Sequence, residues 1–185
     1  AQAFSIEVTG GSNGMSDLFS TTLYTGTGSN LEINNNIDLT EGGLVWVKRR
    51  NGGDPHWLVD TARGLNKSLQ SNTANAENTG TQQIVSFDSD GFTLGNSNQG
   101  QNYNGLPYVS WTWKKQSNFF DIVTYTGNNA SQTVNHNLGS VPGMVIVKRL
   151  NDAGNWGVKH RSIGNNFGVF LNLNHAAAQN STYWN

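Results

Sequence analysis

The chain has 185 residues and a net charge of −1, with 11 Lys and Arg against 12 Asp and Glu, so only 12% of its residues are charged. A typical soluble domain is about 25% charged, and amides and hydroxyls, which favour turns and strand faces, supply the polarity here instead. The sequence lacks the basic stripe of a nucleic-acid-binding protein, has no Cys for disulfides or thiolate sites, and has no apolar run approaching the roughly 18 residues of a membrane span.

We therefore expect an all-β protein with no nucleic-acid partner and no membrane insertion. Apolar and alternating runs predict strands, which in chain order are Leu44–Lys48, Ile84–Phe87, Tyr108–Lys114 and Met144–Lys148. Turns rich in Gly, Asn and Asp are predicted between them at 51–55, 88–91 and 151–154. The one helical candidate, 174–180, is predicted to form at most one turn. Strands and turns at this spacing predict a β-sandwich, with Trp46, Trp111 and Trp113 packed in its core.

The sequence contains one motif twice, about 100 residues apart. The matched segments are 23–26 with 124–127, 33–37 with 134–138, 43–49 with 143–149, and 69–78 with 171–180. An offset that drifts by only one or two residues indicates an internal repeat. In this alignment Trp57 corresponds to Trp156, and His136 takes the place of Asn35.

The second copy is incomplete, because the chain ends before any counterpart of the strands at 84–114. We divide the chain into an N-terminal segment (1–18), a first β-sandwich repeat (19–118) and a second, truncated repeat (119–185). A sandwich without its last strands exposes unpaired N–H and C=O groups. We expect these groups to be covered by Phe4–Val8, by a strand of a neighbouring subunit, or by a longer polypeptide.

Two series of segments carry a family resemblance. In the first copy they are 24–26, 43–50, 60–64, 86–95 and 108–114, and in the second they are 120–127, 138–144 and 155–162. Together they resemble the repeated concanavalin-like domain of bacteriophage tail and virion structural proteins, which is common in phages of marine bacteria and cyanobacteria. The resemblance implies tandem jelly-roll units in a virion surface protein that works by adhesion or assembly.

The same resemblance implies other virion subunits as partners, a homo-oligomer for which a trimer is one option, a host-surface glycan as a ligand, and an extracellular place on the virion. We expect a tail, fibre or head-decoration component that is not an enzyme and needs no cofactor. The alternative prediction is a carbohydrate-binding module, or a fragment of a depolymerase that acts on host envelope glycans.

Trp57 and Trp156, with their neighbours His56 and Asn155, are the candidate ligand-binding residues. Each Trp follows a polar turn, and Trp rings stack on sugars as well as packing in cores, so both roles stay open for these residues. The four His residues show no i, i+4 or His-x-His spacing that suits a metal, and we expect them at the surface or in turns: His56, His136, His160 and His175.

Asp88 and Asp90 are the one pair of acids with alternating spacing. Glycosidases use two facing acids about 5 to 10 Å apart, but Asp88-Ser89-Asp90-Gly91 between two apolar runs predicts a hairpin turn. A calcium site at these residues is the weaker alternative, because Ca²⁺ needs about six or more oxygen ligands. The sequence therefore predicts no catalytic residue and no metal site.

Overall fold

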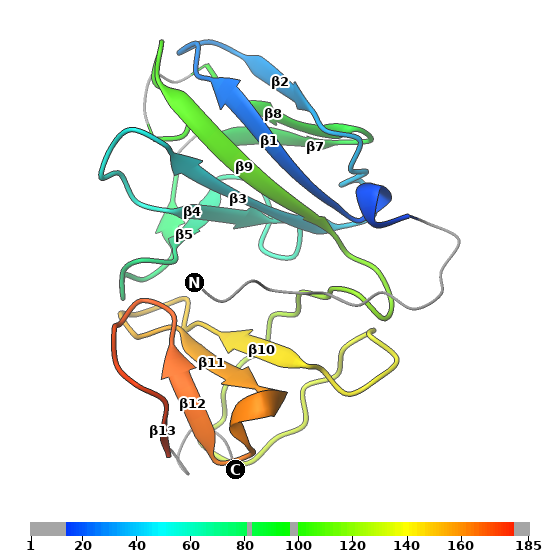
Figure 1. Ribbon diagram of the computed structural model, residues 1–185, viewed down its shortest axis with the longest axis vertical. Helices are drawn as coiled ribbons and strands as arrows, with labels where there is room; N and C mark the ends of the chain where they lie inside the picture. Colours follow the sequence, from blue (N-terminus) through cyan, green and yellow to red (C-terminus); the bar gives the residue numbers. More distant parts are fainter. Residues whose placement is uncertain (1–13, 81–82, 97–99, 180–185) are drawn as a thin grey trace.

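The computed structural model describes residues 14–80, 83–96 and 100–179 and contains two β units, one above the other in Figure 1. The larger unit consists of two sheets that lie face to face, and the smaller unit has one sheet. The predicted segment 4–8 lies outside the described residues. The expectation of an all-β chain is confirmed, and the paired strands of its sheets are antiparallel.

The larger unit pairs a six-stranded sheet with a three-stranded one. The six-stranded sheet runs in the order β1 (Phe19–Thr25), β9 (Pro107–Lys114), β3 (Gly43–Arg49), β4 (Trp57–Asp60), β5 (Lys67–Gln70) and β6 (Asn78–Thr79). The three-stranded sheet runs β2 (Leu31–Asn34), β8 (Gly91–Leu94) and β7 (Ile84–Asp88), and a short 3-10 helix, η1 (Met15–Asp17), precedes β1. The strands predicted in this part of the chain and the turn at 88–91 are confirmed.

The core lies between these two sheets and follows from the alternation of side chains along each strand. On β9 every second residue is buried, beginning with Tyr108, and on β3 the fully buried side chains are Val45 and Val47. Side chains from both inner faces meet here, as in other sandwiches, and the cluster consists of Ile33, Ile37, Leu39, Val45, Val47, Val59, Ile84, Phe92, Leu94 and Tyr108.

The strand tryptophans lie outside this core, contrary to the prediction. Because side chains alternate, Trp111 and Trp113 project from the opposite face of β9 and are only half-buried. Trp46 joins them from β3, with ring centroids 6.0 Å from Trp111 and 6.1 Å from Trp113. These rings form a band on the outer face of the six-stranded sheet.

The smaller unit repeats β3 to β6. Its strands are β10 (Met144–Val147), β11 (Gly157–His160), β12 (Phe167–Phe170) and β13 (Ala178–Gln179), with a 3-10 helix, η2 (Arg161–Ile163), after β11. Thr61 N–H donates to Gly43 O, and Arg161 N–H donates to Gly143 O at the equivalent place. The stretch predicted as at most one helical turn contains β13 and no helical turn among its described residues, 174–179.

The structural offset between these strands is 100 residues, and it corrects the alignment of the two tryptophans. Val47 pairs with Trp57 on β4, whereas Val147 pairs with Gly157 on β11. Trp156 therefore corresponds to His56, and Trp57 corresponds to Gly157. Because side chains alternate along a strand, a shift of one residue places them on opposite faces of the sheet, so the two tryptophans do not have equivalent environments.

Trp156 joins the two units. It is buried against Leu58 and Leu69, and its indole N–H donates to Gln70 O and Thr73 O at 3.0 and 3.1 Å. Backbone hydrogen bonds continue the contact, from Glu77 N to Leu150 O at 2.8 Å and from Gly154 N to Ala74 O at 2.7 Å. The smaller sheet is thus docked on β5 and the loop that follows it.

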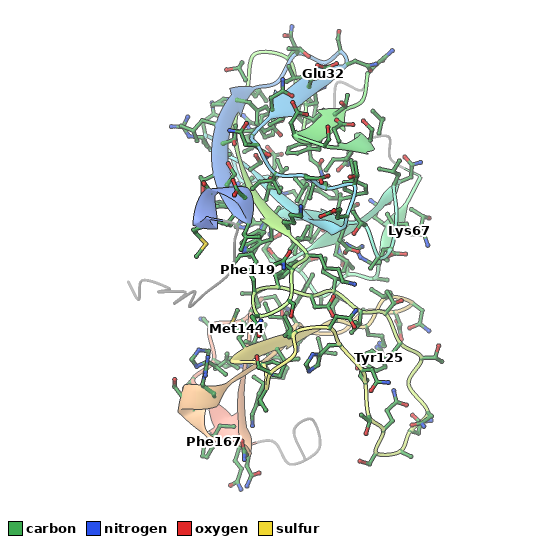
Figure 2. All side chains as sticks on the ribbon, turned by 90° about the vertical axis from the view of Figure 1, so that its right-hand side faces the viewer. Glu32, Lys67, Phe119, Tyr125, Met144 and Phe167 are labelled. Carbon is green, nitrogen blue, oxygen red and sulfur yellow. The ribbon has the colours of Figure 1, made fainter. Side chains whose placement is uncertain are left out.

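The smaller unit has an open edge. In the larger unit β3 lies between β9 and β4, whereas β10 pairs with β11 alone among the strands of the described residues. Residues 121–126, which correspond in sequence to residues 20–25 of β1, pair with no strand of the described residues. Figure 2 shows Tyr125 of this segment on a loop that stands apart from the β10 ribbon, where Met144 is labelled.

We predict that Trp156→Ala lowers the free energy of unfolding by about 3 to 5 kcal/mol, because it leaves a cavity where the two units meet. Trp156→Phe is expected to cost about 1 kcal/mol through loss of the indole hydrogen bonds. Urea denaturation measures both effects, with Leu23→Ala, an exposed site on β1, as the control within about 0.5 kcal/mol of wild type. A Trp156→Ala protein as stable as the control would contradict the docked arrangement.

Candidate functional site

A pocket of about 240 Å³ lies beside Trp57 in the larger unit. Four segments build it: the β3–β4 loop with the first residue of β4, strand β6, the residue before β7, and the β8–β9 loop. Its lining residues are Asp54, Pro55, Trp57, Asn78, Gln83, Gly100 and Tyr103. Aromatic rings, side-chain amides and one carboxylate thus face a single small volume.

The β3–β4 loop is held by charged side chains. Lys48 Nζ donates to the carbonyl oxygens of Arg49 and Gly52, at 2.9 and 2.6 Å. The Arg49 guanidinium donates to Asn51 Oδ1 and forms an ion pair with Asp54, both at 2.9 Å. The turn rich in Gly and Asn that the sequence predicts here is therefore fixed, and Asp54 reaches the pocket already paired with a cation.

The opposite wall is fixed by Tyr108. Its hydroxyl donates to Gly100 O and accepts from Tyr103 N–H, both at 3.1 Å. Burial raises the pKa of Tyr108, so the hydroxyl stays protonated and keeps both roles. Gly100 has a φ of 56°, and a Cβ there would lie 2.7 Å from Gln83 Nε2. Glycine at position 100 thus satisfies the backbone and makes room for the Gln83 amide.

Two polar atoms of the lining residues are buried without a partner. Trp57 is 9% exposed and Gln83 is 4% exposed, and neither Trp57 Nε1 nor Gln83 Oε1 has a hydrogen-bond partner among the described residues. More than about 90% of buried polar groups in proteins are paired, and an unpaired one costs about 1 to 3 kcal/mol. In the part of the chain that the structure describes, Trp46, Ser68 and Gln101 also carry buried atoms without a partner, but only in this pocket do two lining residues supply one such donor and one such acceptor.

The structure does not bring the four predicted ligand-binding residues together. Trp57 lines the pocket, and His56 precedes it, with its backbone N–H donating to Asn72 Oδ1 at 3.0 Å. Trp156 is buried where the two units meet, which agrees with the packing role left open for it. Asn155 is exposed on the smaller unit, and its Oδ1 accepts from Asn172 Nδ2 at 2.9 Å.

Six of the seven pocket residues were not predicted from the sequence: Asp54, Pro55, Asn78, Gln83, Gly100 and Tyr103. They come from segments up to about 50 residues apart that the sandwich brings together. Only Asp54 and Pro55 stood in a predicted feature, the turn at 51–55. No local pattern marks the other four, because each is an ordinary residue of an Asn- and Gly-rich chain.

Asp88 and Asp90 lie in a hairpin, as predicted: Asp88 ends β7 and Asp90 lies in the turn before β8. Asp88 Oδ2 accepts from Thr93 Oγ1 at 2.8 Å, and the Asp90 carbonyl accepts from the backbone N–H groups of Asn35 and Asn36. Both line a second hollow of about 380 Å³, together with Glu32, Asn34, Ser86 and Thr93. These bonds are those of a structured turn.

Two of the histidine rings accept hydrogen bonds from backbone N–H groups two residues further along the chain. His136 Nδ1 accepts from Leu138 N–H at 3.2 Å, as Asn35 Oδ1 accepts from Ile37 N–H at 3.1 Å, which supports their alignment in the repeat. His160 Nδ1 accepts from Ser162 N–H at the start of η2. Across the described residues, no group of three or more His, Cys, Asp or Glu is arranged to hold a metal ion. No helix there has the length and apolar character needed to cross a membrane.

Comparison with protein families places the chain in a family without a defined function. A family model described as "Domain of unknown function (DUF7483)" matches residues 14–185, a span that contains both units. Neither a curated protein nor a solved structure matches the chain.

We predict that His56 titrates below the value of about 6.5 expected for an unfolded chain. Burial lowers the pKa of His56, and the positive charge of Lys48 lowers it further. Because the unfolded chain then binds the proton more readily, the free energy of unfolding decreases as the pH falls from about 6.5 toward the folded-state pKa.

An NMR titration of the His56 ring signals, assigned with His56→Asn, measures this midpoint. Added salt screens Lys48 and is expected to raise the midpoint without restoring it fully, since burial is the larger cause. A midpoint at or above 6.5 at low salt would contradict the placement of His56.

Proposed function

We propose that this chain, which belongs to the family described as Domain of unknown function (DUF7483), is a non-enzymatic structural component of a bacteriophage virion. In this proposal it is a tail, fibre or head-decoration subunit on the virion surface. Its units are tandem concanavalin-like sandwiches, the second incomplete, and they serve host-surface adhesion or particle assembly. The sequence resemblance supports the family type, and the open edge of β10 supports a role in assembly.

The open edge is the observation that carries the proposal. Val45 on β3 is fully buried, whereas its counterpart Val145 on β10 is 36% exposed. Met144 and Ile146 are also exposed, so apolar side chains project from both faces of this edge strand. Natural proteins protect such edges with charge, proline or a covering segment, because an exposed apolar edge pairs readily with another strand.

The larger unit shows which strand is absent beside β10. In the larger unit β9 pairs with β1 from Phe19↔Trp113 to Thr25↔Pro107 and with β3 from Gly43↔Lys114 to Arg49↔Tyr108. Residues 120–126 and β10 are the counterparts of those two flanking strands. An added strand beside β10 would complete its backbone hydrogen bonds and shield one flank of its side chains, as in β-strand addition between subunits.

We therefore propose that a second copy of the chain supplies this strand, so that subunits associate through their smaller units. Closed, symmetric homo-oligomers are the common outcome of such contacts. In this arrangement the larger unit, docked through Trp156, is presented away from the contact as the adhesive part.

A carbohydrate-binding module is the second candidate function, and the pocket beside Trp57 favours it. An indole ring, amides and a carboxylate around a small volume are the groups that recognise sugars. A depolymerase fragment would in addition release reducing ends from host glycans, and a reducing-end assay separates these two forms of the alternative.

We predict that Ile146→Lys weakens self-association of the purified chain by at least about tenfold, because a charge on an edge strand opposes strand pairing. Light scattering over a range of protein concentrations measures the association. Ile146 is 42% exposed in the single chain, so the Ile146→Lys substitution should leave the melting temperature of the protein unchanged.

Val141→Lys is the matched control, because Val141 is 89% exposed and lies outside β10. It should associate as wild type does. A wild-type chain that stays monomeric at all concentrations, or an Ile146→Lys chain that associates equally well, would refute pairing of copies through β10.

A further inference from the structure

The pocket beside Trp57 is lined by two residues that each carry a buried polar atom without a partner, one a donor and the other an acceptor. Trp57 Nε1–H can only donate and Gln83 Oε1 can only accept, and both atoms are buried without a partner among the described residues. Both residues line the same volume of about 240 Å³. A molecule that pairs with both atoms must itself carry donors and acceptors.

The charges of the lining residues exclude further classes of ligand. An anion would accept from the indole N–H but would leave Gln83 Oε1 unpaired and face the carboxylate of Asp54. A cation would suit the amide and carboxylate oxygens but could not accept from Trp57, and Arg49 already neutralises Asp54 at 2.9 Å. A hydroxyl group donates and accepts at once, so neutral hydroxyl-bearing ligands fit this set of atoms best.

The volume of the pocket and its aromatic lining indicate a ligand that consists of a single ring. Pockets for drug-sized ligands have about 300 to 1,000 Å³, and this one is smaller. Trp57, Tyr103 and Pro55 supply flat apolar surface, while Asn78 adds further amide donors and acceptors. A compound with one apolar ring face and a rim of hydroxyls matches both kinds of lining.

The walls are held before any ligand binds. Arg49 fixes the loop that carries Asp54, and the Tyr108 hydroxyl fixes Gly100 and Tyr103. Gly100 gives the Gln83 amide its space. Little ordering is then needed on binding, which favours useful affinity from a small contact.

We propose that this pocket binds one neutral, hydroxyl-rich ring, a single neutral sugar residue, with Trp57 Nε1–H donating to one hydroxyl and Gln83 Oε1 accepting from another. This site lies in the larger unit and does not depend on strand pairing at β10. Failure of either proposal therefore leaves the other standing.

The test uses the full chain and methyl glycosides of neutral hexoses and N-acetylhexosamines, with glucosamine and methyl glucuronide as charged probes. Two-dimensional NMR of the tryptophan indole N–H groups reports binding, and Trp57→Phe assigns the Trp57 signal. We expect at least one neutral glycoside to shift that signal saturably, with a Kd of the order of 1 mM. The charged probes should bind at least about tenfold more weakly.

Two variants locate the site. Trp57→Phe keeps an aromatic ring but removes the donor, and Gln83→Leu keeps the approximate size but removes the acceptor; each should weaken binding at least about tenfold. Trp111→Phe, on the outer face of the same sheet, is the matched control and should bind as wild type does. The backbone amide spectrum shows whether each variant is folded, and Gln83→Leu provides the test if Trp57→Phe is not.

Three results would overturn the proposal. The Trp57 signal could stay unchanged with every neutral glycoside, which would mean that Trp57 Nε1 and Gln83 Oε1 bind no sugar. A charged probe could bind more tightly than the neutral ones. Finally, folded Gln83→Leu could bind as wild type does, which would place the sugar elsewhere on the chain.

Discussion

The pairing of β9 with β1 on one side and β3 on the other is the constraint on which the larger unit depends. Strand β9 matches both neighbours residue for residue over seven positions each. Its inward side chains, among them Tyr108 and Thr112, close the core against the three-stranded sheet. The same strand fixes the pocket, because the Tyr108 hydroxyl holds Gly100 and Tyr103 in the loop before it.

The smaller unit shows what the same kind of sequence does without that strand and without a facing second sheet. The residues of β3 and β10 are similar, Gly-Leu-Val-Trp-Val-Lys-Arg against Gly-Met-Val-Ile-Val-Lys-Arg, yet Val45 is fully buried and Val145 is not. Residues 121–126 resemble residues 20–25 of β1 in sequence but form no strand. Strand formation here therefore depends on a partner across the sheet more than on local propensity. Trp156 gives the smaller unit the contact with the rest of the chain that its own core does not provide.

The sequence predicted four of the thirteen strands in the described residues, the hairpin at Asp88 and the repeat, because these depend on local alternation and turn chemistry. It misplaced Trp156 by one residue relative to Trp57, since two tryptophans after similar turns align well whatever the register. Only the cross-strand pairs, Val47 with Trp57 and Val147 with Gly157, distinguish the two alignments. The pocket depends on contacts between distant segments, so its amide and aromatic residues carried no local signal beyond Trp57 itself.

The corrected register also separates what the repeat shares from what one copy adds. Both copies keep the backbone bonds of β3 to β6 and the Asn72 or Asn172 side chain that accepts from the residue before β4 or β11. The pocket is not shared: Gly157 replaces Trp57, and Gln83, Gly100 and Tyr103 lie in the part of the first copy that 119–185 does not repeat. The repeated strands thus form a shared scaffold, and the pocket is built largely from segments of the larger unit outside those strands.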